Sequence, residues 1–141
     1  MHIKKFRLRT MDCIFLLLSL MLCFGPHFIF PPCGPKSDGT WMNCHWAEQT
    51  VIGLGIVLTV LAAVRLLFAD ARIKAGISIA AVPVSIVTAC VPGTLVPLCM
   101  MTTMRCHTVM RPAVILIAGT IAVLQAVDAV ILIKKTARPS P

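Results

Sequence analysis

Four long apolar runs constrain the fold of this chain more than any other feature. They cover approximately residues 11–30, 47–69, 73–95 and 112–133. Each is close to the ~20 apolar residues that a helix needs to cross the ~30 Å hydrocarbon core of a bilayer. The composition agrees, since 58% of the residues are hydrophobic and only 13% are charged. We therefore expect an all-α, polytopic membrane protein with four transmembrane helices in a single domain over residues 1–141.

The distribution of basic residues predicts how these helices are oriented. Ten of the 13 Lys and Arg residues lie in the N-terminal arm, around the turn between the second and third runs, and in the tail. The other connections, residues 31–46 and 96–111, hold the remaining three. Lys and Arg accumulate on the cytoplasmic side of membrane proteins. We expect a cell-membrane protein with both termini in the cytoplasm and residues 31–46 and 96–111 as outward loops. The clusters lack the aromatic residues that a nucleic-acid surface would interleave with them, so we expect no nucleic-acid partner.

The first run could also be a cleaved signal peptide, because it follows a basic start. No small-x-small cleavage site follows it, and apolar residues continue through Phe30 beyond the Gly25-Pro26 break. We therefore expect the first helix to remain in the protein.

A Met-x-Cys-His motif occurs twice, at residues 42–45 and 104–107. Each copy ends an outward loop and precedes a returning helix, and each loop holds one earlier cysteine, Cys33 or Cys99. The two halves of the chain therefore share one plan, which predicts two parallel helical hairpins. An axis along the membrane normal would then bring the two outward loops together.

These residues carry a resemblance to a known family. CHW opens the second run and CMMTTMRCHTVMRPA opens the fourth. With four short helices, the chain resembles a family of small bacterial and archaeal integral membrane proteins that is classed as a domain of unknown function. The resemblance covers nearly the whole chain. It implies a four-helix membrane fold with outward Cys-His motifs as its signature, and it implies no activity.

The seven cysteines divide by predicted depth. Cys13, Cys23 and Cys90 lie inside apolar runs, where a thiol behaves as a small hydrophobic group. The other four lie in outward loops, and an even number of cysteines in an oxidising compartment indicates disulfides. Cys33 could pair with Cys44 and Cys99 with Cys106, or two bonds could join hairpin to hairpin.

The same loops also favour a soft-metal site. Thiolate, thioether and imidazole groups together suit copper(I) or zinc. Adjacent Cys and His side chains do not readily converge on one ion, and Glu48 could instead orient a histidine. The candidate metal or disulfide cluster comprises Cys33, Cys44, His45, Cys99, Cys106, His107, Met42 and Met104, and the Met100-Met101 pair could assist.

Two other functions remain open. Four helices with outward cysteines resemble quinone-linked thiol-disulfide exchange proteins in outline, but a Cys-x-x-Cys pair is absent from the sequence, which argues against an enzyme. At this size, the chain could instead act as an accessory subunit that packs against a larger membrane transporter, or it could self-associate.

Polar residues within the runs predict one further feature. Arg65 and Asp128 lie at similar depths near the cytoplasmic ends of the second and fourth runs, so we expect an intramembrane ion pair. Gly53 and Gly55 would allow another helix to approach the second one closely. Pro83, Pro92 and Pro97 predict a kink or break in the third run.

Overall fold

The computed structural model describes the backbone of residues 2–137 and the side chains of residues 9–137. The chain is all-α. Four long helices and one π-helical turn form it: α1 (His2–Phe28), α2 (Asn43–Leu67), α3 (Ala71–Cys90), η1 (Cys106–Met110) and α4 (Arg111–Ala137), with η1 running directly into α4. All four long helices contain a segment that is long and apolar enough to cross a membrane. This confirms the expected polytopic membrane fold.

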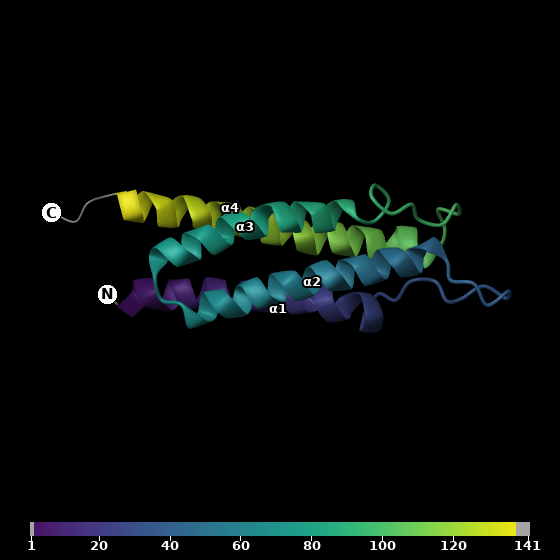
Figure 1. Cartoon of the computed structure of the whole chain (residues 1–141), viewed down its shortest axis with the longest axis horizontal. Helices are drawn as coiled ribbons and strands as arrows, with labels where there is room; N and C mark the ends of the chain where they lie inside the picture. Colours follow the sequence, from purple (N-terminus) through teal and green to yellow (C-terminus); the bar gives the residue numbers. More distant parts are fainter. Residues whose placement is uncertain (1, 138–141) are drawn as a thin grey trace.

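The helices pack as two hairpins (Figure 1). α1 lies along α2 and α3 lies along α4, while fewer contacts join α2 to α3 and α1 to α4. α1 begins and α4 ends at the same end of the bundle, which also holds the short α2–α3 connection. The two longer connections, residues 29–42 and 91–105, lie together at the opposite end. We call this the outer end, after the orientation expected from the basic residues. The predicted arrangement of two parallel hairpins is confirmed.

α3 is shorter than the apolar run that contains it, which extends to residue 95. The helix ends at Cys90, because Pro92 has no N–H group to continue the hydrogen-bond ladder. Gly93 then adopts a φ of +91°, which favours glycine. The chain turns back at this point, since Val96 N donates to Val91 O at 3.0 Å and Gly93 N donates to Val96 O at 3.0 Å. The break directs the following segment, including Cys99, over the outer end of the bundle.

Large apolar side chains lie both in the interior of the bundle and on its surface, as in a protein embedded in a bilayer. Leu22, Leu58 and Ile121 are fully buried between the helices, whereas Leu17 and Leu116 are 63% and 69% exposed. Large aliphatic side chains exposed all around a helix bundle suit a lipid environment, where they need no protein cover.

Gly55 permits a close approach between α1 and α2. A Cβ atom at this position would lie only 2.8 Å from the backbone nitrogen of Cys23, whereas a Cβ at Gly53 would meet nothing within 4 Å. Of the two glycines in the second run, only Gly55 therefore lies at a helix contact.

Candidate functional site

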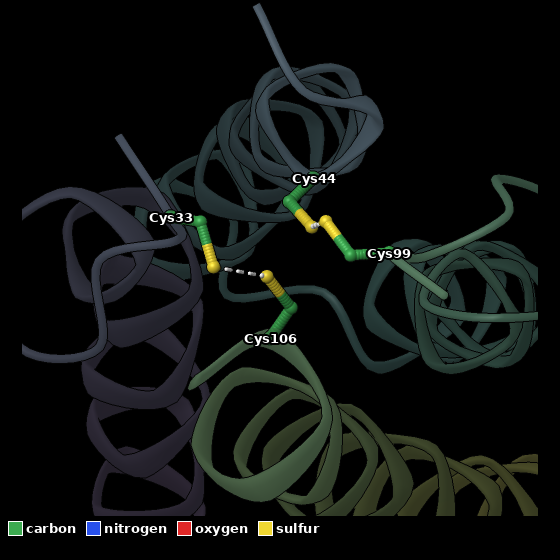
Figure 2. A group of neighbouring side chains, drawn as sticks. All are labelled: Cys33, Cys44, Cys99 and Cys106. Atoms are coloured by element: carbon green, nitrogen blue, oxygen red, sulfur yellow. Dashed lines mark hydrogen bonds between the residues drawn. The ribbon is translucent and has the colours of Figure 1, made fainter. Parts of the chain in front are cut away.

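Four cysteine side chains meet at the outer end of the bundle, one from the outer end of each helix (Figure 2). Cys33 follows α1, Cys44 lies in the first turn of α2, Cys99 follows α3, and Cys106 opens η1. Their Sγ atoms all lie within 4.8 Å of one another. Cys44 and Cys106 are fully buried, and the other two are partly buried. We call this group the four-thiol centre.

The closest sulfur pairs join one hairpin to the other. Cys44 Sγ lies 2.6 Å from Cys99 Sγ, and Cys33 Sγ lies 3.1 Å from Cys106 Sγ. Both separations exceed the ~2.05 Å of a disulfide bond, and all seven cysteines are free. The expected disulfides are therefore not formed in this structure. The nearest pairs are also not those that would close each loop on itself. Each pair joins the earlier cysteine of one hairpin to the motif cysteine of the other.

The geometry of the four-thiol centre is close to that of a metal site. A tetrahedral zinc ion with Zn–S bonds of ~2.3 Å places its sulfur ligands about 3.8 Å apart. The sulfur–sulfur distances in the four-thiol centre lie around this value: the two closest pairs are 2.6 and 3.1 Å apart, and all four atoms lie within 4.8 Å of one another. To complete a tetrahedron, the pair at 2.6 Å would have to separate by about 1.2 Å and the pair at 3.1 Å by about 0.7 Å. The four cysteines could therefore bind a metal ion.

The two motif histidines lie beside this centre and have other partners. His45 stacks on Trp41 with the ring centroids 4.2 Å apart, and its Nδ1 lies 3.6 Å from Glu48 Oε2. His107 Nε2 lies at hydrogen-bond distance, 2.8 Å, from the carbonyl oxygen of Cys99. Among the described His, Cys, Asp and Glu residues, the group of converging ligand atoms consists of the four thiols. His45 lies in the first turn of α2 and His107 lies in η1, and each has partners other than the four sulfur atoms. The position of Glu48 next to His45 is the one considered from the sequence.

Glu48 has a second imidazole neighbour that the sequence did not clearly predict. This carboxylate is only 5% exposed, and its Oε1 lies 3.5 Å from His27 Nδ1 at the outer end of α1. An acid and two histidines therefore join α1 to the start of α2 next to Cys44. The signal in the sequence was the interruption of the first apolar run by Gly-Pro-His.

Methionines border the centre on one side. Met42 Sδ lies 3.8 Å from Cys99 Sγ. Met100, Met101 and Met104 join Met42 around a cavity of about 430 Å³, which also reaches Cys99. Both methionines of the candidate cluster, Met42 and Met104, thus lie on the same side of the four-thiol centre.

At the opposite end of the bundle, Arg65 is the centre of a buried polar network. Its guanidinium pairs with Asp128 of α4, the partner expected from depth, and with Asp12 of α1, whose Oδ1 lies 2.6 Å from Nε. Gln125 Oε1 accepts a further hydrogen bond from Nη1 at 2.8 Å. Lys74 of α3 pairs with the second oxygen of Asp12. All four helices therefore contribute to one network.

Asp12 and Lys74 were missed as members of this network. Lys74 is one of the basic residues around the turn between the second and third runs, which served only to predict the orientation. The signal for Asp12 was its position within the first span, because an unpaired acid in a membrane is costly and implies a partner.

Comparison with known proteins agrees with this architecture. Neither a curated protein nor a solved structure matches the chain significantly. Residues 15–131 match the family model described as "Domain of unknown function (DUF4418)". This segment includes most of the bundle and all four cysteines of the four-thiol centre. The chain belongs to the DUF4418 family.

Proposed function

We propose that this is a multi-pass protein of the cell membrane, with both termini in the cytoplasm, whose outward four-thiol centre binds one soft metal ion, zinc or copper(I). The observation that carries the proposal is the convergence of four Sγ atoms from four separate segments within 4.8 Å. The excess of Lys and Arg at the other end of the bundle supports the orientation.

Only the four loop and motif cysteines meet in the four-thiol centre, which argues against chance packing. Cys33 and Cys106 are 73 positions apart in the sequence, and Cys44 and Cys99 are 55 apart. The three remaining cysteines lie along the helices and do not join the centre. Packing of small hydrophobic groups alone would not gather the four outward thiols and leave out the others.

Thiolates would give this site its chemistry. They are soft ligands that select zinc and copper(I) over hard cations such as calcium and magnesium. Each thiol must lose its proton to bind, so binding releases protons. An ion held by Cys33 and Cys44 of one hairpin and by Cys99 and Cys106 of the other would join the two hairpins at the outer end, where the buried polar network cannot reach.

A second candidate function has an observation of its own. The two closest sulfur pairs, Cys33 with Cys106 and Cys44 with Cys99, are suited to two disulfides between the hairpins. Each bond would form as two thiols give two protons and two electrons to a protein disulfide, which is reduced to two thiols. Closing loops of this length stabilises a protein by about 4 kcal/mol each in the chain-entropy model.

One experiment separates the two candidates. The full chain is purified from membranes in detergent without reductant, and its free thiols are alkylated and counted by mass spectrometry. A second sample is reduced, loaded with zinc under anaerobic conditions and analysed for metal. We expect one zinc ion per chain after loading, a loss of binding in Cys44→Ser and Cys106→Ser, and normal binding in the matched controls Cys13→Ser and Cys90→Ser.

The contrary outcomes are equally definite. Reduced protein that binds neither zinc nor copper(I), or controls that lose as much zinc as the centre variants, would overturn the metal proposal. Two disulfides in the purified protein together with a reduced form that binds no metal would establish the second candidate.

A further inference from the structure

Four of the eight methionines of this chain line a single cavity beside the four-thiol centre. The cavity has a volume of about 430 Å³ and opens at the outer end, where Met100 is fully exposed and Met101 is 61% exposed. Packing in the bundle does not require these side chains, because they stand on the outward loops. Their gathering in one place therefore calls for a chemical reason.

The cavity reaches the four-thiol centre directly. Cys99 belongs to its lining and is also a member of the centre, and Met42 Sδ lies 3.8 Å from Cys99 Sγ. An ion that entered between the methionines would meet Cys99 first. The other three thiols lie within 4.8 Å of that sulfur.

The chemistry of the lining distinguishes between metal ions. Thioethers are neutral, soft ligands that stabilise copper(I), whereas zinc prefers thiolate, imidazole and carboxylate ligands. The described residues that line the cavity include a cation, Lys36, and no carboxylate. A positive charge without an acidic partner repels a divalent ion more strongly than a monovalent one.

We infer that the methionine cavity is an entry site for copper(I), in which Met42, Met100, Met101 and Met104 capture the ion and pass it through Cys99 to the four-thiol centre. This inference rests on the proposed function, because it names the ion that the centre receives and its route. The transfer exchanges thioether ligands for thiolates and involves no change of oxidation state. It releases the thiol protons to water.

The test compares two ions and two sets of methionines in the full-length reduced protein. Copper(I) is presented as its complex with a coloured chelator under anaerobic conditions, and the rate and extent of its transfer are followed by the loss of colour. Zinc binding is measured by competition with a zinc indicator. The test variant carries Leu at positions 42, 100, 101 and 104, which keeps apolar volume and removes the sulfur atoms. The control carries Met11→Leu and Met21→Leu on α1, away from the cavity.

We expect the rate of copper(I) transfer to the test variant to be about 10- to 100-fold lower than to the wild type. Removing groups that support metal ligands usually has an effect of this size. Its zinc binding should be unchanged, and the control should match the wild type for both ions. Copper(I) uptake at the wild-type rate in the test variant would overturn the inference, as would an equal loss of zinc and copper(I) binding.

The failure of this inference is distinguishable from that of the proposed function. A wild-type protein that binds zinc and takes up no copper(I) refutes the entry site alone. A wild-type protein that binds neither ion with all its thiols reduced refutes both.

Discussion

Replacing Gly55 by alanine tests how closely the first hairpin must pack. The added methyl group would lie 2.8 Å from the backbone nitrogen of Cys23 and 2.9 Å from the carbonyl carbon of Leu22. Ordinary contacts between such atoms are about 3.5 to 4.0 Å. The neighbouring atoms belong to the backbone of α1, so the whole helix must move away from α2 by about 0.7 Å or more, with loss of contacts along the interface.

Two opposing effects determine the magnitude. Overpacking of a closely packed contact costs about 1 to 3 kcal/mol, whereas Gly→Ala inside a helix gains up to about 1 kcal/mol from helix propensity. Gly53→Ala is a matched control, because it lies two residues earlier in α2 with no atom within 4 Å of its Cβ position. Because both variants gain the same helix propensity, this gain cancels when their free energies of unfolding are compared. We expect Gly55→Ala to be about 1 to 3 kcal/mol less stable than Gly53→Ala.

The free energy of unfolding is measured in mixed micelles by titration with SDS, with helix content followed by circular dichroism. Equal stability of the two alanine variants would refute the reasoning, because it would mean that α1 and α2 do not approach each other at Gly55. A stabilised Gly53→Ala variant is expected in either case.

Three further predictions concern the network, the thiols and the orientation. Asp12→Asn should lower the free energy of unfolding by about 3 to 5 kcal/mol, because Arg65 and Lys74 lose a buried carboxylate. The control Asp38→Asn, in the exposed outer connection, should change it by less than about 0.5 kcal/mol. SDS titration measures the free energy of unfolding of both variants. Zinc binding should weaken steadily as the pH is lowered from about 8 to 6, because each thiol must lose a proton to bind, and a pH-independent affinity in indicator competition would exclude thiolate ligands. A membrane-impermeant maleimide added to intact cells should attach one more label to Asp38→Cys than to the wild type and no additional label to Thr136→Cys. The reverse pattern would invert the proposed topology.

The fold was predictable because bilayer thickness fixes the length of a spanning helix. Apolar runs alone identified four helices, and the repeated position of Cys and His identified the two hairpins. The end of α3 was harder to place, because Val91, Leu95 and Val96 continue the apolar character beyond the helix. In that segment the backbone restrictions of Pro92 and the left-handed φ of Gly93 outweigh hydrophobicity.

The site was predictable only in part, because adjacency in sequence is not adjacency in space. Neighbouring residues of a helix point about 100° apart, so Cys44 faces the interior of the bundle while His45 stacks on Trp41. The sequence therefore named all four cysteines among eight candidate residues, but it could not show that the four thiols converge without the histidines. Cys33 and Cys99 lie in irregular loops, whose course no periodicity reveals, and only the fold shows that they complete the four-thiol centre.

The same limit applied to the buried network. Equal depth in the membrane predicted the pairing of Arg65 with Asp128, which the structure contains. Depth could not show that Asp12 shares the same guanidinium, because that depends on which faces of α1 and α2 meet. Gly55 and Arg65 are both buried in α2, and both contact α1, through the backbone of Cys23 and the carboxylate of Asp12.

X-ray absorption at the zinc edge of the reduced, zinc-loaded protein tests the central claim most directly, because it counts the atoms bound to the metal and identifies them. We predict a shell of four sulfur atoms at about 2.3 Å, reduced in number when Cys44 or Cys106 is replaced by serine. A shell dominated by nitrogen or oxygen at about 2.0 to 2.1 Å would contradict metal binding by the four-thiol centre. It would indicate that the neighbouring histidines bind the ion instead.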